Sequence, residues 1–173
     1  MDPESRLTTV LSIEAHEQPV LWELVSGNEL SAEHFVPSDV DPLVTVIHQG
    51  KNTLPAAKLF QKRFCRTDQA DKVWGYNAQP FAWLTGPGYF VGHTAESGPA
   101  KYVIDYTELP PSKPDDWPRI ASNTSGIGRL VYGNMKDYVR AVSSHVCIGR
   151  AYRGDEPMAQ YFVLCRRDPA PSA

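Results

Sequence analysis

Short aromatic and β-branched segments, separated by turn residues, follow one another between residues 72 and 106. Runs of this kind predict strands, which we place at 72–76, 80–84, 89–94 and 101–106. The connections between them are short and carry Gly, Pro and Asn, the residues that tight turns favour. Because such connections join neighbouring antiparallel strands, this part of the chain predicts an antiparallel meander.

Further strands are expected on either side of the meander. The apolar run at 43–47 ends at a Gly-containing turn and predicts a strand. Two longer runs, Val146–Tyr152 and Met158–Arg166, are separated by turn residues at 154–157 and predict a β-hairpin.

Helical spacing appears in the N-terminal half of the chain. Residues 5–16 predict a helix, while the run at 20–25 fits either a buried strand or a short helix. Thr53 is a suitable cap for a helix over 54–64, whose apolar side would carry Leu59, Phe60 and Phe64. The opposite side of that helix would be basic, with Lys58, Lys62, Arg63 and Arg66.

A second long helix is predicted over 126–142, with Ser125 as its N-cap. Its apolar residues recur at steps of three and four: Ile127, Val131, Met135, Tyr138 and Val142. The Pro-rich segment 107–125 before it has no sustained period and predicts a long loop, of the kind that often wraps the surface or acts as a lid.

The order of these elements lacks the strand–helix alternation of a parallel sheet. We therefore expect an α+β domain, in which a curved antiparallel sheet, made of the meander and the C-terminal hairpin, is packed on one face by helices. The length of 173 residues fits a single domain over 1–173, and residues 167–173 are expected to be a disordered tail.

Composition narrows the class of protein. Apolar residues make up 42% of the chain, too many for a disordered protein, yet no apolar run approaches the ~20 residues of a membrane-spanning helix. A net charge of −3 argues against a dedicated nucleic-acid binder. The N-terminus has no secretory signal, so we expect a cytoplasmic chain with reduced thiols at Cys65, Cys147 and Cys165.

Aromatic residues are the most prominent candidates for a binding site. An aromatic-lined pocket would use Trp74, Tyr76, Trp83 and Tyr89, although packing in the core explains the same residues. The start of the second helix could bind an anionic group through exposed backbone N–H groups near Ser125 and through Arg129; the alternative is an ordinary helix start.

Four residues are candidates for catalysis. Asp105 lies in the apolar strand Val103-Ile104-Asp105-Tyr106, where a carboxylate on the buried face could act as general acid or base. If the buried face is that of Ile104, Asp105 is simply solvated. His93 could lie at a pocket rim, and His145 with Cys147 has a spacing compatible with a thiolate–imidazole pair, or with structural residues.

These residues predict a small-molecule-binding domain, or a small acid–base enzyme that acts on an aromatic or anionic substrate. The alternative is a protein-interaction domain that uses its aromatic sheet or the basic face of residues 58–66. The expected partner is a small-molecule ligand, with no membrane and no nucleic acid, and a homo-oligomer stays open. We find no cofactor motif and no His, Asp and Glu spacing typical of a metal site.

Overall fold

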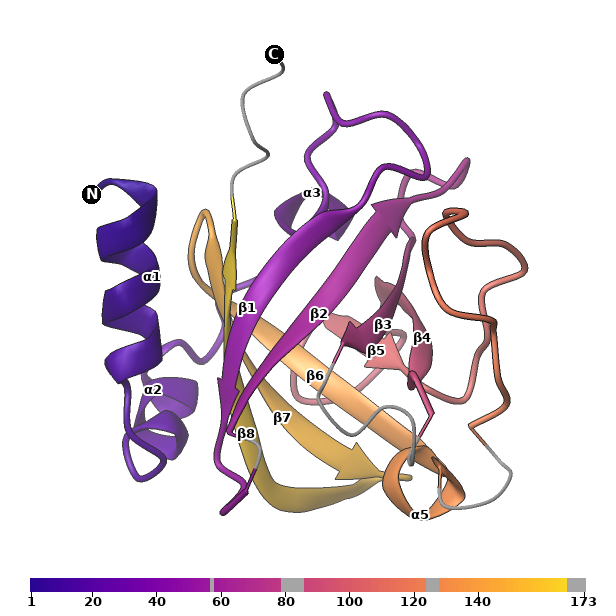
Figure 1. Ribbon diagram of the computed structural model, residues 1–173. Helices are drawn as coiled ribbons and strands as arrows, with labels where there is room; N and C mark the ends of the chain where they lie inside the picture. The colour runs from indigo at the N-terminus through magenta and orange to yellow at the C-terminus, as the bar shows by residue number, and fades with distance from the viewer. Residues whose placement is uncertain (57, 79–85, 124–127, 168–173) are drawn as a thin grey trace.

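The computed structural model describes residues 1–56, 58–78, 86–123 and 128–167 (Figure 1). Its helices are α1 (Pro3–Ser12), α2 (Gln18–Leu24), α3 (Ala32–Phe35) and α5 (Gly128–Tyr132). Its strands are β1 (Val46–Asn52), β2 (Leu59–Arg66), β3 (Val73–Ala78), β4 (Tyr89–Thr94), β5 (Tyr102–Asp105), β6 (Met135–Ser143), β7 (Val146–Arg153) and β8 (Glu156–Arg166). Among the described residues, none of the helices combines the length and the apolar character needed to cross a lipid bilayer.

The strands form a closed antiparallel barrel rather than an open sheet. Each strand pairs with the next along the chain, and β8 returns to pair with β1, with Gly50 opposite Leu164. The predicted α+β class is therefore wrong. A sheet that closes on itself buries its inner face without a covering layer of helices, and the longer helices α1 and α2 lie outside the barrel (Figure 1).

Two predicted helices are strands of the barrel. The segment predicted as a helix over 54–64 contributes β2, which pairs with β1 and β3. Residues 135–142 of the segment predicted over 126–142 belong to β6, which pairs with β5 and β7, and only the short α5 before it is helical among the described residues. In both segments the ladder hydrogen bonds of two neighbouring strands override the helical spacing of the apolar residues.

Other predictions agree with the structure more closely. The helix predicted over 5–16 overlaps α1, which begins two residues earlier and ends at Ser12, and residues 20–25 lie largely in the short helix α2. The C-terminal hairpin is present as β7 and β8, and three of the predicted meander strands correspond to β3, β4 and β5. The fourth, at 80–84, lies outside the described residues, and the strand predicted at 43–47 begins at Val46. The segment 107–123 contains no helix or strand.

Large rings and glycines alternate inside the barrel. A Cβ atom at Gly75 would collide with the ring of Phe90, and one at Gly149 would collide with the ring of Phe162. These glycines therefore leave space for the aromatic side chains in the narrow interior of an eight-stranded barrel.

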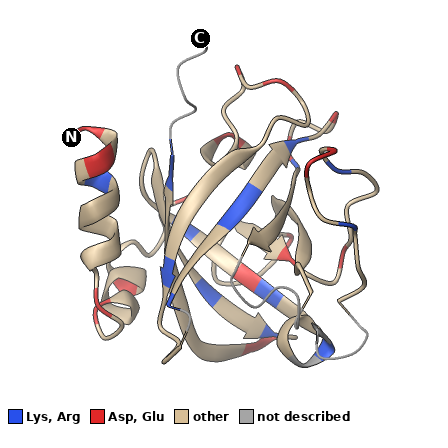
Figure 2. Cartoon of the chain, in the orientation of Figure 1, with Lys and Arg blue, Asp and Glu red and all other residues tan. Residues whose placement is uncertain are grey.

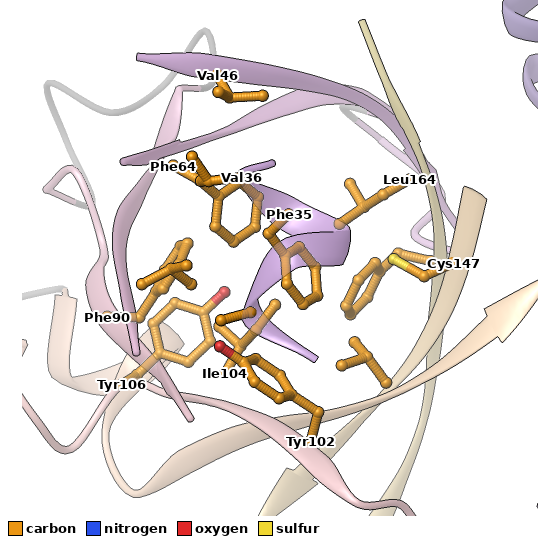
Figure 3. Packing of buried hydrophobic residues seen from close by; sticks show 14 of the residues in the cluster. Phe35, Val36, Val46, Phe64, Phe90, Tyr102, Ile104, Tyr106, Cys147 and Leu164 are labelled. Atoms are coloured by element: carbon orange, nitrogen blue, oxygen red, sulfur yellow. The ribbon is translucent and has the colours of Figure 1, made fainter. Parts of the chain in front are cut away.

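The helix α3 closes one end of the barrel. Figure 3 shows Phe35 of α3 among the inward side chains of the strands, where its ring stacks on Phe64 with 4.8 Å between ring centroids. The imidazole of His48 contacts the Phe35 carbonyl oxygen through Nε2 at 2.9 Å, and Arg166 donates to the His34 carbonyl oxygen at 2.6 Å. This end of the barrel is packed and apolar at its centre.

Replacing His48 should reduce the acid sensitivity of the fold. Burial lowers the pKa of His48 from 6.5 to about 3, so the unfolded chain takes up a proton first as the pH falls. The stability that the neutral imidazole contributes is complete above pH 6.5 and is lost as the pH falls toward 3. Between about pH 7.5 and about pH 4.5 the parent should lose roughly 3 kcal/mol more stability than His48→Gln. Urea denaturation at the two pH values measures this difference, and equal losses would contradict it.

Candidate functional site

A lysine lies inside the barrel. Strand alternation in β2 directs Phe60, Lys62 and Phe64 to the interior, and only 3% of the Lys62 side chain is exposed. Its Nζ donates to Asn77 Oδ1 at 2.8 Å, to Asp137 Oδ2 at 3.2 Å, and to the hydroxyl of Tyr106. The three donor positions of the ammonium are thus all used.

The partners of Lys62 come from other parts of the barrel. Asn77 is in β3, Tyr106 follows β5, and Asp137 is in β6 (Figure 2 colours the charged positions of β2 and β6). The Tyr106 hydroxyl accepts from Asn77 Nδ2 at 3.1 Å and donates to Asp137 Oδ2 at 3.0 Å. We call these four residues, Lys62, Asn77, Tyr106 and Asp137, the polar tetrad.

Aromatic rings surround the tetrad. The Lys62 ammonium lies 5.0 Å from the ring centroids of both Tyr106 and Phe162, and 5.1 Å from that of Phe90. Tyr132, the last residue of α5, stacks on Tyr106 at 5.3 Å. These contacts add cation–π attraction and exclude water from the charged groups.

The electrostatics of the tetrad are those of a coupled buried pair. Burial lowers the pKa of Lys62, and the Asp137 carboxylate opposes that effect. Burial also raises the pKa of Tyr106 well above its usual value, and the nearby Asp137 carboxylate adds to the shift. A buried ion pair is poor evidence for stability, because removing two charges from water offsets most of their attraction. Perturbed titratable groups gathered in one place are instead typical of functional sites.

The predicted catalytic residues do not form one site. Asp105 and His93 lie together on the outer face of the barrel, with 4.0 Å between Asp105 Oδ2 and His93 Nε2. His145 lies in the turn between β6 and β7, whereas Cys147 is fully buried inside the barrel. Burial raises the pKa of the Cys147 thiol, which disfavours the thiolate that a nucleophile needs.

Three of the predicted aromatic residues lie on the outer face of the barrel. Trp74, Tyr76 and Tyr89 belong to a cluster on the outer face of β3 and β4, which Trp117 of the 107–125 segment covers. The Trp117 indole is fixed by a 2.7 Å hydrogen bond from Nε1 to the Thr45 hydroxyl. The cluster is therefore a packed contact between barrel and loop.

The remaining candidates are placed as follows. Trp83 and Ser125 lie outside the described residues, and Arg129 is exposed on α5. The basic face of residues 58–66 is not a single surface, because its residues alternate across β2 as a strand requires. Lys58 is exposed, while Lys62 is buried inside the barrel.

The tetrad was not predicted from the sequence, because Lys62 was assigned to a helix surface and Asp137 to no site. Alternation was the available signal. Phe60, Lys62 and Phe64 share one parity in the sequence, and so do Met135, Asp137 and Val139. A polar residue between two apolar residues of the same parity indicates a polar group on a buried face of a strand.

Comparisons with protein-family models, with curated proteins and with solved structures gave no match for this chain.

A double replacement should show that the ion pair is not kept for stability. Lys62→Met leaves the Asp137 carboxylate buried without its cation and should cost about 3–5 kcal/mol. The double variant Lys62→Met/Asp137→Leu should recover most of that loss, because it removes both charges. Equilibrium urea denaturation of the variants measures these differences.

The matched control is Lys58→Met, which changes an exposed lysine of the same segment. Its stability should stay within about 0.5 kcal/mol of the parent. If the double variant is as unstable as Lys62→Met, the ion pair is structural, which contradicts a functional role for the tetrad.

Proposed function

We propose that this protein is a small-molecule-binding barrel and that its ligand lies at the end of the barrel that holds the polar tetrad. The observation that carries this proposal is the set of four hydrogen-bonded polar side chains in the interior, each no more than 5% exposed. An eight-stranded barrel is wide enough for either packed side chains or one small ligand. A few polar groups within apolar walls are also the usual composition of a ligand site.

The two ends of the barrel support placing the ligand near the tetrad. At one end Phe35 of α3 packs with Phe64 and Tyr102 in the interior. Its ring centroid lies 4.8 Å from that of Phe64 and 5.3 Å from that of Tyr102. At the other end the covering element is α5, a helix of only five residues. Tyr132 and Tyr106 stack there, so a displacement of α5 would expose the tetrad.

The charges of the tetrad favour a neutral ligand over an anionic one. Lys62 and Asp137 compensate each other at 3.2 Å, so the site has no net charge to offer to an anion. A carbonyl or hydroxyl oxygen that replaces one of the internal acceptors, such as Asn77 Oδ1, would instead receive a hydrogen bond from the Lys62 ammonium. The rings of Phe60, Phe90 and Phe162 suit an apolar or aromatic body.

Acid–base catalysis is a second candidate, because the tetrad is a continuous proton path. The Tyr106 hydroxyl accepts from the Lys62 ammonium and donates to the Asp137 carboxylate. A substrate oxygen bound at Lys62 would then contact a proton donor that is connected through Tyr106 to the Asp137 carboxylate. The interaction-domain alternative has less support, because the outer aromatic cluster is covered and the basic face is divided.

The test uses three probes of similar size: acetophenone, benzoate and ethylbenzene. Acetophenone has a neutral carbonyl, benzoate is anionic, and ethylbenzene has no oxygen. Acetophenone should bind about tenfold more tightly than either of the others, since one or two hydrogen bonds contribute on that order. Amide chemical shifts of β2, β3 and β6 in NMR titrations would report both affinity and location.

The double variant Lys62→Met/Asp137→Leu is the control for recognition of the oxygen. It should bind acetophenone and ethylbenzene with equal affinity, because its site has lost the ammonium and the carboxylate. Preferred binding of benzoate, or acetophenone shifts confined to the outer face of the barrel, would contradict the proposal.

A further inference from the structure

Three metal-ligating side chains meet on the outer face of the barrel, apart from the tetrad. His93 Nε2 lies 4.0 Å from Asp105 Oδ2 and 3.9 Å from Glu108 Oε1. His93 is in β4, Asp105 ends β5, and Glu108 begins the segment that follows. The register places Val91 opposite Asp105 and His93 opposite Val103, so His93 and Asp105 are diagonal neighbours on one face.

The tautomer of His93 is fixed by a backbone contact. Its Nδ1 lies 2.9 Å from the Thr94 carbonyl oxygen, and a carbonyl can only accept, so Nδ1 carries a proton. In the neutral ring Nε2 then presents a lone pair. Nε2 is inaccessible to solvent and has no hydrogen-bond partner among the described residues. A hydrogen bond that fixes the distal nitrogen in this way is the usual support of a metal-binding histidine.

The carboxylate of Asp105 is also held in place. Its Oδ1 accepts from the Thr107 backbone N–H at 2.8 Å and from the Thr107 hydroxyl at 2.6 Å. Oδ2 is thereby directed toward His93, and only 4% of the side chain is exposed. Glu108 is more exposed, with 51% of its side chain accessible to solvent.

Three acceptor atoms therefore face one another without a donor between them. Two carboxylate oxygens and an imidazole lone pair repel unless a cation or a proton lies between them. Lys136 compensates part of this negative charge, with Nζ at 3.1 Å from Asp105 Oδ2. Its ammonium does not lie between the three acceptor atoms, and 36% of its side chain is exposed. The Lys136 ammonium could therefore leave Asp105 for solvent if another cation took its place.

We propose that His93, Asp105 and Glu108 form a binding site for a divalent transition metal, of which zinc is the representative. One imidazole and two carboxylates suit zinc, with water as the fourth ligand. In a tetrahedral site the ligand atoms lie about 3.4 Å apart, whereas the three ligand atoms here lie within 4.8 Å of one another, so the exposed Glu108 side chain has to move toward the other two. The bound metal links β4 and β5 to the start of the 107–125 segment, whose Trp117 covers the outer aromatic cluster.

The sequence gives no metal-type spacing because the ligands belong to different elements. Strand pairing brings His93 and Asp105 together. Glu108 follows Asp105 by three residues, after the turn in which the Thr107 N–H donates to Asp105. Ligands assembled by sheet register leave no short motif in a sequence.

The test is isothermal titration of the untagged full chain with zinc, and with magnesium as a control for nonspecific acidic binding. Zinc should bind with a stoichiometry of one and raise the melting temperature by about 5 °C at saturating concentration. Magnesium, which prefers oxygen ligands in octahedral geometry, should not bind measurably. His93→Ala should weaken zinc binding about a hundredfold, whereas His16→Ala, at an exposed histidine elsewhere, should not change it.

Lys136→Met gives the sharpest comparison. If Lys136 competes with the metal for Asp105 Oδ2, its removal should tighten zinc binding by about fivefold. Absence of zinc binding by the parent chain overturns the proposal, even if Lys136→Met binds, because the native lysine then provides the cation itself. Zinc binding that survives His93→Ala also overturns it, since the metal would lie elsewhere.

Discussion

The pairing of β1 with β8 is the interaction on which the structure depends. Five residues of β1, from His48 to Asn52, pair with Phe162 to Arg166, and this ladder turns a meander into a closed barrel. Closure removes both sheet edges and creates an interior that no open sheet has. Gly50 allows this close approach, since a Cβ atom there would collide with the side chains of Phe60 and Leu164. Only in such an interior do Lys62 and Asp137, 75 positions apart, meet across the barrel.

The same interior explains why two strands were predicted as helices. In β2 and β6 the inward positions alternate as strands require, but Lys62 and Asp137 interrupt each row of apolar residues. An interrupted row is a weaker strand signal, and the spacing of the apolar residues predicted helices instead. In β6 the predicted helical stripe combined Met135, which faces inward, with Tyr138 and Val142 of the other face.

Other parts of the fold were predictable because their patterns are local. The β7–β8 hairpin, α1 and most of the meander follow from turn residues and short-range spacing. Strand closure, by contrast, depends on register between β1 and β8, which are more than 100 residues apart. Trp74, Tyr76 and Tyr89 lie in one cluster on the outer face, but alternation alone does not say which face of a strand is inside. The inward positions between them include Gly75, where a Cβ atom would collide with the ring of Phe90.

One pair of strands connects the two candidate sites. In the β5–β6 ladder Ile104 faces Asp137 on the inside, while the next pair, Asp105 and Lys136, faces outward. The tetrad and the outer cluster are thus built on consecutive residues of the same strands. Because a strand has a side-chain period of two, neither site can shift along β6 without moving the other. If a cation binds at the outer cluster and an oxygen at the tetrad, as proposed above, the two sites share the β5–β6 ladder as their common support.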